Sequence, residues 1–423
     1  MSSTISDPAS DGVVRAADGT PLKQRLNRAL RREKLRSFLL ILPLLAFIVL
    51  SFIMPIADML FRSVENQIVE ETIPLTVVAL KEWDPASGEA PGEEVFAAFH
   101  ADFVQAFKDK KHTRLGLRLN YDEPGMSGLF RKTGRPSTKM QPPYKEAFIK
   151  VDEDWGTVET WAVIKQASPA YTDGYFLNAV DAHRTAKGIE MVPENERIYL
   201  FLFGRTMFLS IVITMSCLLL GYPIAFLLAS LPLRSSNMLM ILVLLPFWTS
   251  LLVRTSAWKV LLQQQGVVND FLVWIGLVND ADRLIMINNQ FGTIVAMTHI
   301  LLPFMILPLF SVMKTISPNY VRAAKSLGAN DWTAFWKVYF PQSIPGIGAG
   351  AILVFILSIG YYITPELVGG TSGIFISNRI AYHISTSLNW GLAAALGTIL
   401  LALVMLLFYV YDKIVGIDNV KLG

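Results

Sequence analysis

Several charged and aromatic side chains lie inside or at the ends of long apolar stretches of this 423-residue chain. Arg254 falls between two tryptophans, Trp248 and Trp258, and His299 falls within another apolar stretch. A charged group inside a membrane-spanning helix costs about 2.5–3.5 kcal/mol on insertion scales, so such groups are candidates for function. Arg254 could also pair structurally or extend to the lipid headgroups, and His299 could be a satisfied interior histidine.

A second group comprises Tyr361, Tyr362 and Glu366, with Pro365 and Gly369 beside them as helix breakers. Tyrosine faces and a carboxylate attract a cation. Together with Trp248, Arg254 and His299, this group predicts non-covalent binding of a small polar solute. Because Glu366 is the only carboxylate at this end and Arg254 is a cation, zwitterionic and anionic solutes remain open.

Covalent and metal chemistry find no support in the sequence. The five histidines and the single cysteine, Cys217, show no metal-ligand spacing. No G-x-x-x-x-G-K-[ST] phosphate loop is present; the stretch GTSGIF at 370–375 lacks the lysine. We expect no catalytic residue, metal or cofactor on this chain, so the energy for any transport must come from a partner.

A polar segment at 314–346 interrupts the apolar stretches. Pro318 suits the first turn of a helix, and Gly328 suits a left-handed C-cap. Asn330 or Asp331 can cap a second helix over 332–339, which Pro341 is expected to stop. The small residues Ala323, Ala324 and Gly328 allow the backbone of another protein to approach closely. The alternative is an amphipathic connector lying on lipid headgroups.

These candidates require membrane-spanning helices to position them. The chain is 52% hydrophobic and 17% charged, whereas soluble proteins carry about 25% charged residues. A helix of roughly 20 apolar residues spans a bilayer. Stretches of this kind lie at 38–60, 207–231, 238–262, 291–313, 347–367 and 391–411.

The distribution of lysine and arginine predicts the orientation of these spans. Basic residues cluster within 23–36 and 314–337, whereas the connection 263–290 carries three aspartates and one arginine. We therefore expect a basic cytoplasmic tail (1–37), a first span (38–62), a core (197–415) with the segment 314–346 in the cytoplasm, and a cytoplasmic C-terminal tail (416–423). The acid-rich insert at 63–196 would lie outside the membrane, with helix-like runs and strand-like runs such as TRLGLRLN at 113–120.

The stretch RAAKSLGA, followed by FWKVYFPQSIPG, resembles the cytoplasmic EAA loop of permease subunits of binding-protein-dependent ABC importers. In that family the pattern is Glu-Ala-Ala, Gly, then a hydrophobic-Pro pair and Pro-Gly; here Arg322 replaces the glutamate. LGYPIAFLLAS and YYITPELVGG resemble segments of the spermidine/putrescine branch.

The resemblance implies an all-α polytopic membrane protein with the six transmembrane helices of the type I ABC importer permease fold, here with a small mixed α/β extracytoplasmic insert. It implies a bacterial inner-membrane permease without its own ATPase motif, and no nucleic-acid partner. Its partners would be a dimer of ABC ATPase subunits that binds ATP and Mg²⁺, a second and different permease, a periplasmic substrate-binding protein and the bilayer. The residues carried over to the ATPase-coupling loop are Arg322, Ala323, Ala324, Leu327, Gly328, Ala329, Asp331 and Pro341.

The resemblance implies a polyamine such as spermidine or putrescine as the solute. The sequence leaves open an opine, an amino-acid-like compound or an anionic compound moved by the same machinery. An ion-coupled secondary transporter is a further alternative, but it would place several acids within the spans, where Asp58 and Glu366 are the only ones expected. A membrane-anchored receptor would need a cytoplasmic signalling domain, for which the tails are too short.

Overall fold

The computed structural model describes residues 22–185 and 188–415. Residues 1–21 of the expected N-terminal tail and the expected C-terminal tail, 416–423, lie outside the described residues. The chain divides into two compact units, Met1–Phe61 and Arg62–Gly423, and each is considered by itself.

The described part of the first unit is one long helix, formed by α1 (Leu22–Ile48), a π-helical turn (Val49–Ile53) and α2 (Met54–Arg62). Its apolar part, Leu30–Arg62, is long enough to cross a membrane. Residues 22–37, expected as part of a separate basic tail, are helical and continuous with this span.

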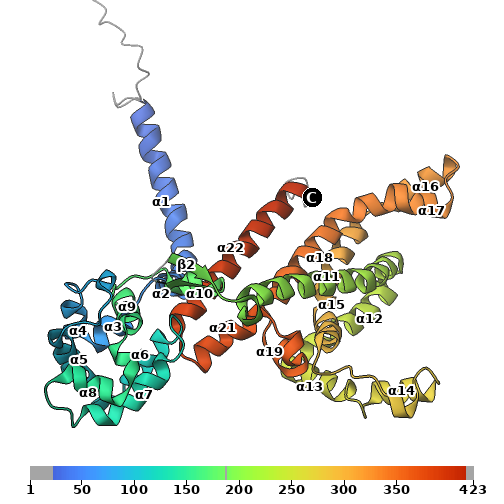
Figure 1. The fold of residues 1–423 in the computed structure, drawn as a ribbon. Coiled ribbons are helices and arrows are strands. Elements are labelled where there is room, and N and C mark those ends of the chain that lie inside the picture. The colour runs from blue at the N-terminus through green and yellow to red at the C-terminus, as the bar shows by residue number, and fades with distance from the viewer. Residues whose placement is uncertain (1–21, 186–187, 416–423) are drawn as a thin grey trace, which may run out of the picture. The chain divides into compact units, whose positions relative to one another are not determined.

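The insert is mainly helical and has its own aromatic core (Figure 1). Trp155, Trp161 and Phe99 are fully buried at its centre, and the ring centroids of Phe99 and Trp155 are 4.8 Å apart. The α-helices of the insert are α3 (Gln67–Thr72), α4 (Pro74–Ala79), α5 (Glu93–Lys108), α6 (His112–Leu119), α7 (Met126–Ser137), α8 (Tyr144–Val151), α9 (Val158–Gln166) and α10 (Gly174–Ala179). Its short 3₁₀ turns are Pro85–Ser87, Glu153–Gly156 and Glu194–Glu196.

The strand-like runs of the insert are helical, which corrects part of the expected mixed α/β fold. In α6, Leu115 and Leu119 are fully buried, whereas Leu117 is 39% exposed. The alternation of leucines predicted a strand. The buried leucines are instead four residues apart, which is the spacing of residues on one face of a helix. The β structure among the described residues is instead an antiparallel hairpin, β1 (Ala182–Thr185) with β2 (Gly188–Met191), in which His183 pairs with Glu190.

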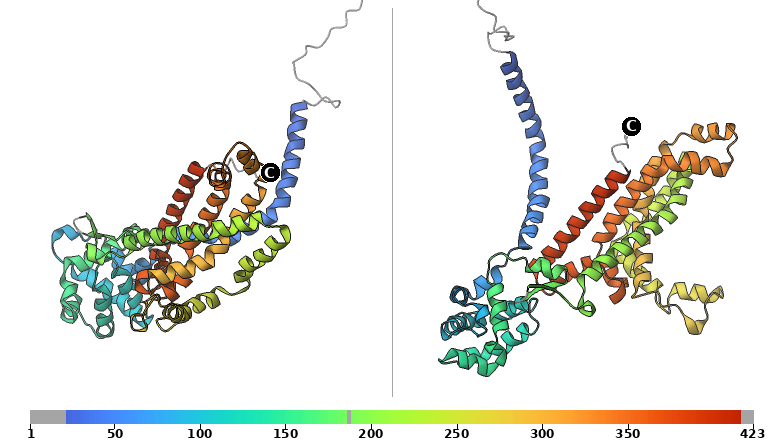
Figure 2. Two further views of the ribbon diagram at one scale, coloured as in Figure 1. Left: turned by 90° about the vertical axis from the view of Figure 1, so that its right-hand side faces the viewer. Right: turned by 45° about the horizontal axis from the view of Figure 1, so that its top comes forward.

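The core consists of long helices that pack side by side (Figures 1 and 2). Helices α11 and α18 both pack against α15. Close approach depends on missing side chains: a Cβ added at Gly350 would lie 2.7 Å from Met305 Sδ, and one added at Gly221 would lie 3.1 Å from Met305 Cγ. The α-helices of the core are α11 (Tyr199–Ser230), α12 (Leu233–Leu244), α13 (Leu251–Leu261), α14 (Val267–Trp274), α15 (Gln290–Thr315), α16 (Pro318–Ser326), α17 (Asp331–Ala334), α18 (Phe340–Gly360), α19 (Ile363–Val368), α20 (Gly370–Gly373), α21 (Ile376–Ser385) and α22 (Trp390–Val415).

Among the described residues, five helices are long and apolar enough to cross a membrane, and a bent pair raises the number to six. The bent pair corrects the expected continuous span 238–262. It joins Leu233–Trp248, which ends in a 3₁₀ turn (Leu245–Trp248), to α13 at an angle of 94°. Pro246 lies in that turn, and the Ser250 hydroxyl then caps α13 by accepting from the Val253 N–H at 3.2 Å. A second correction is that the fifth span ends at Gly360 rather than continuing to 367.

Pro341 does not stop a helix, contrary to expectation. A π-helical turn (Phe335–Tyr339) joins α17 to α18, so Asp331–Gly360 forms one candidate span. Proline removes one helix hydrogen bond and its ring clashes with the carbonyl four residues earlier. The wider π turn places that carbonyl out of α-helical register. Pro55 follows the π turn Val49–Ile53 at the same spacing in the first unit.

A buried carboxylate fixes the insert to the start of the core. Asp181 is 4% exposed and accepts hydrogen bonds from the N–H groups of Ile198, Tyr199 and Leu200, at 3.0, 3.1 and 2.7 Å. These are the first N–H groups of α11, which have no acceptors within the helix and carry a partial positive charge. The insert therefore ends where α11 begins.

We expect Asp181→Ala to destabilise the protein by about 2 kcal/mol, because it removes a charged helix cap. Asp181→Asn keeps one acceptor oxygen and should cost about half as much. The measurement is the midpoint of thermal unfolding of the purified chain in detergent. Asp84→Ala is the matched control, because Asp84 caps an exposed 3₁₀ turn in the insert; an equal effect of the two alanine variants would contradict the assignment.

Candidate functional site

The segment after α15 forms a tight helix–turn–helix. Ser317 caps α16, which begins at Pro318, and Gly328 ends it with φ +92°. The Ala329 N–H donates to the Ala324 carbonyl at 3.0 Å, and the Gly328 N–H donates to the Lys325 carbonyl at 3.0 Å. This pair of bonds is a Schellman motif, which favours glycine at the left-handed position. Asn330 Oδ1 caps α17 by accepting from the Thr333 N–H at 2.7 Å.

The tip of this segment is exposed and positively charged. Leu327 is 89% exposed, and Arg322, Ala323 and Gly328 are exposed beside it, while Ala324 and Ala329 are half-buried. Lys325 forms an ion pair with Asp331, whereas Arg322 has no ion pair among the described residues. The predicted coupling residues thus lie together, with the exception of Pro341, which lies in α18.

The aromatic base of this segment rests on the C-terminal end of α11. The ring centroids of Phe226 and Phe335 are 5.8 Å apart, and those of Phe226 and Tyr339 are 5.1 Å apart. Lys314 Nζ also lies 3.4 Å from the Ala229 carbonyl. Any displacement of the tip is therefore applied directly to α11.

A helix break separates α18 from α19, at Tyr361 and Tyr362. Two side chains of α21 donate to the carbonyls at the break, and the Tyr362 carbonyl also accepts from the Glu366 N–H of α19 at 3.0 Å. Ser377 Oγ donates to the Tyr361 carbonyl at 2.7 Å, and Asn378 Nδ2 donates to the Tyr362 carbonyl at 2.9 Å. Asn378 Nδ2 also lies 2.7 Å from Glu366 Oε2. Tyr362, Glu366 and Asn378 are thus one connected group at the break.

Arg254 lies near a different part of the break. It is close enough to His299 and Tyr361 for electrostatic interaction. Its Nε is buried with no hydrogen-bond partner among the described residues. The ring of Trp258, one helical turn further along α13, packs edge-on against His299 with centroids 5.5 Å apart. Trp248 is 87% exposed and lies across the sharp bend, in the turn before α13.

Sequence reasoning missed the residues that hold the break together. Ser377 and Asn378 are buried polar neighbours that, with Arg379, interrupt the apolar run 374–381. This polar interruption was the signal available in the sequence. Arg205 also lies near the break: its Nη1 donates to the Thr371 carbonyl at 2.8 Å, and its guanidinium lies 4.4 Å from the Phe201 ring centroid.

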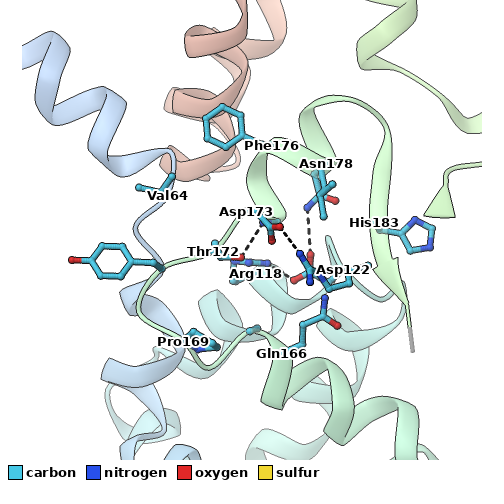
Figure 3. Close-up of a pocket in the computed structure, with 15 residues that line it drawn as sticks. Val64, Arg118, Asp122, Gln166, Pro169, Thr172, Asp173, Phe176, Asn178 and His183 are labelled. Atoms are coloured by element: carbon cyan, nitrogen blue, oxygen red, sulfur yellow. Dashed lines mark hydrogen bonds and ion pairs between the residues drawn. The ribbon is translucent and has the colours of Figure 1, made fainter. Parts of the chain in front are cut away.

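A polar pocket of about 490 Å³ lies in the insert near β1 (Figure 3). The buried Arg118 donates through Nη1 to Asp122 Oδ2 at 2.6 Å and through Nε to the Tyr175 hydroxyl at 3.1 Å. Arg184 pairs with Asp173. Both arginines are thus partnered within the chain, and Tyr175 packs on Gly391 of α22, where an added Cβ would lie 2.3 Å from the ring. This pocket is therefore part of the connection between insert and core.

Several candidate membrane-spanning helices, a stabilised helix break and an exposed helix–turn–helix segment are the features of a multi-pass membrane protein. The chain belongs to the family described as "Binding-protein-dependent transport system inner membrane component", which matches residues 199–416. It is therefore an inner-membrane permease subunit of an ABC importer, and the family match begins at the first residue of α11.

Similar proteins include the "Spermidine/putrescine transport system permease protein PotB" of Haemophilus influenzae, 34% identical over 52% of this chain and 77% of the relative. The protein of the same name in Escherichia coli is 32% identical over 50% of this chain and 77% of the relative. The E. coli "Inner membrane ABC transporter permease protein YdcU" is 30% identical over 58% of this chain and 80% of the relative. A solved bacterial alginate ABC transporter, in complex with an alginate-bound periplasmic protein, is 18% identical over 51% of this chain and 77% of that chain, with a TM-score of 0.44.

We expect Ser377→Ala to destabilise the protein by roughly 1 kcal/mol, because the partly buried Tyr361 carbonyl would lose its side-chain donor. Ser385→Ala is the matched control: Ser385 lies on the same helix, is exposed, and bonds only to the Ala381 carbonyl of that helix and to the hydroxyl of the adjacent Thr386. Thermal unfolding of the two variants in detergent provides the comparison. Equal midpoints would contradict a role for Ser377 in holding the break.

Proposed function

We propose that this permease moves a polyamine of the spermidine/putrescine class from a periplasmic binding protein to the cytoplasm. The observation that carries the solute is the 34% identity to a spermidine/putrescine permease over 77% of that protein's length. ATP and Mg²⁺ would bind to a dimer of separate ATPase subunits, and this chain would contribute no hydrolytic residue. A second, different permease would complete the pathway.

The proposed topology places the insert outside and the segment 314–346 in the cytoplasm, with both termini on the cytoplasmic side. The insert caps the N-terminal end of α11 through Asp181, whereas Phe335 contacts Phe226 near its C-terminal end. A helix of 32 residues is about 48 Å long at 1.5 Å per residue, which exceeds the bilayer core of about 30 Å. This length supports the proposed placement of the two features on opposite sides of the membrane.

The tip of the segment 314–346 is the proposed coupling loop. Leu327 offers an exposed apolar side chain, and the small Ala323 and Gly328 beside it leave room for the ATPase surface. Burial of a leucine side chain contributes about 1.5–3 kcal/mol, enough to anchor the loop. Because Lys325 is neutralised by Asp331, Arg322 presents the unpaired charge at the tip, and we propose a carboxylate opposite it on the ATPase.

The helix break is the proposed solute contact. Tyr361 and Tyr362 offer aromatic faces, and Glu366 is exposed, with its charge held at the break by Asn378. His299 and Trp248 are retained as pathway candidates. Arg254 would repel a polyamine from the part of the break near Tyr361 and so direct it toward Glu366.

We expect Leu327→Asp to reduce solute-stimulated ATPase activity of the reconstituted importer at least tenfold, because a loss of about 1.4 kcal/mol weakens docking tenfold. Leu327 is almost fully exposed, so its substitution should leave folding unchanged. Val78→Asp is the control, since Val78 is 63% exposed in the insert. Unaltered stimulation in Leu327→Asp would exclude this tip as the coupling surface.

A crossed pair of variants tests the solute. For a polyamine, Glu366→Gln should raise the KM for uptake about tenfold, because it removes one charge and keeps an oxygen to accept from Asn378. Arg254→Gln should not raise that KM. An anionic solute would give the reverse pattern, and an ion-coupled secondary transporter would show uptake without ATP. Asp282→Asn, which removes an exposed carboxylate in the connection 263–290, controls for general surface charge.

A further inference from the structure

A basic cleft of about 540 Å³ lies between the insert and the turn that precedes α22. One wall is formed by α6 and α7, which contribute Arg114 and Arg131, and the other by residues 386–390. The cleft has no aspartate or glutamate in its lining. It lies outside the helix break and the coupling loop, so the proposed transport function does not use it.

The two arginines carry uncompensated charge. Both are exposed, and neither forms an ion pair among the described residues. Arg118 also lines the cleft but is neutralised by Asp122. Two free guanidinium groups in one cleft repel each other unless an anion lies between them, and guanidinium groups bind phosphate and carboxylate oxygens through paired N–H donors.

The opposite wall offers one buried donor without an acceptor, since the Ser387 hydroxyl already lies 2.8 Å from His383 Nδ1. Asn389 is 8% exposed and caps α22, because its Oδ1 accepts from the Leu392 N–H at 3.2 Å. Its Nδ2 has no hydrogen-bond partner among the described residues. A buried unsatisfied donor costs about 1–3 kcal/mol. The cleft also lies at the N-terminal end of the 26-residue helix α22, where the helix dipole favours an anion. Ser127, Thr386 and Ser387 add hydroxyl groups.

We propose that this cleft binds a phosphate group. A tetrahedral phosphate has enough oxygens to accept from two guanidinium groups and the hydroxyls together, whereas a carboxylate has two. The source could be inorganic phosphate or the headgroup of an anionic phospholipid. Trp390, which is 48% exposed at the first position of a membrane-spanning helix, favours the lipid, because tryptophan concentrates at headgroup depth.

The test uses the purified full-length chain and two probes. Inorganic phosphate is titrated against the protein in detergent by calorimetry, with chloride at equal ionic strength as reference. Phosphatidylglycerol and phosphatidylcholine are compared by the number of lipids retained in native mass spectrometry. Binding of phosphate supports a soluble source, and selective retention of phosphatidylglycerol supports a headgroup.

The double variant Arg114→Gln/Arg131→Gln should lower the affinity for the probe that binds at least tenfold. Both side chains are exposed, so folding should be unchanged. Asn389→Asp should have the same effect, because it keeps the cap oxygen but replaces the free amide with a negative charge. Arg135→Gln/Lys139→Gln removes equal charge from exposed positions outside the cleft and should bind normally. The proposal is wrong if neither phosphate nor phosphatidylglycerol binds. It is also wrong if the probe that binds is retained equally well after the Arg114/Arg131 substitution.

Discussion

The pairing of backbone groups inside the bilayer governs the arrangement of the core. A carbonyl within the hydrocarbon region has no water to bond to, so a broken helix requires donors from its neighbours. At the break, Ser377 of α21 donates to the Tyr361 carbonyl, and Asn378 adds a second donor to the Tyr362 carbonyl, which also accepts from the Glu366 N–H. The irregular chain that follows is held in the same way, since the Asn288 N–H donates to the Val368 carbonyl at 2.8 Å and Arg205 donates to that of Thr371. The position of Glu366 therefore depends on residues from several helices.

Hydropathy and cap residues predicted much of this structure. The length of the apolar stretches identified the spans, and Gly328 and Asn330 identified the turn between α16 and α17, because both signals are local. The sharp bend before α13 was not predicted: Pro246 was visible, but its effect depends on a cap at Ser250 that competes with helix continuation. Pro341 was expected to end a helix, but the π turn before it accommodates the proline and the helix continues. The partners of Tyr361 and Tyr362 come from distant residues, which periodicity cannot show.

The insert shows the limit of pattern reasoning most clearly. Its aromatic residues indicated a folded unit, and Trp155 and Trp161 do lie at the centre of a buried cluster. The leucines of α6 alternate along the sequence, as they would in a strand. Leu115 and Leu119 are four residues apart, and this spacing places two residues on one face of either a strand or a helix. Only the exposure of Leu117 separates the two, and exposure depends on how α6 packs against α7. Here Gly116 allows that packing: a Cβ at this position would lie 2.7 Å from Phe130 Cβ.

Helix α11 connects the two ends of the core mechanically. At its start, three N–H groups are held by one carboxylate, Asp181, so the insert cannot shift without breaking charge-assisted bonds. Near its other end, Phe226 lies against the aromatic base of the segment 314–346. Between them, α15 approaches α11 closely at Gly221, and α18 approaches α15 closely at Gly350. Helices that are packed this closely move together as rigid bodies, because protein interiors have low compressibility. A displacement at the proposed coupling loop would therefore reach the helix break through α18, which runs without interruption from Phe340 to Gly360.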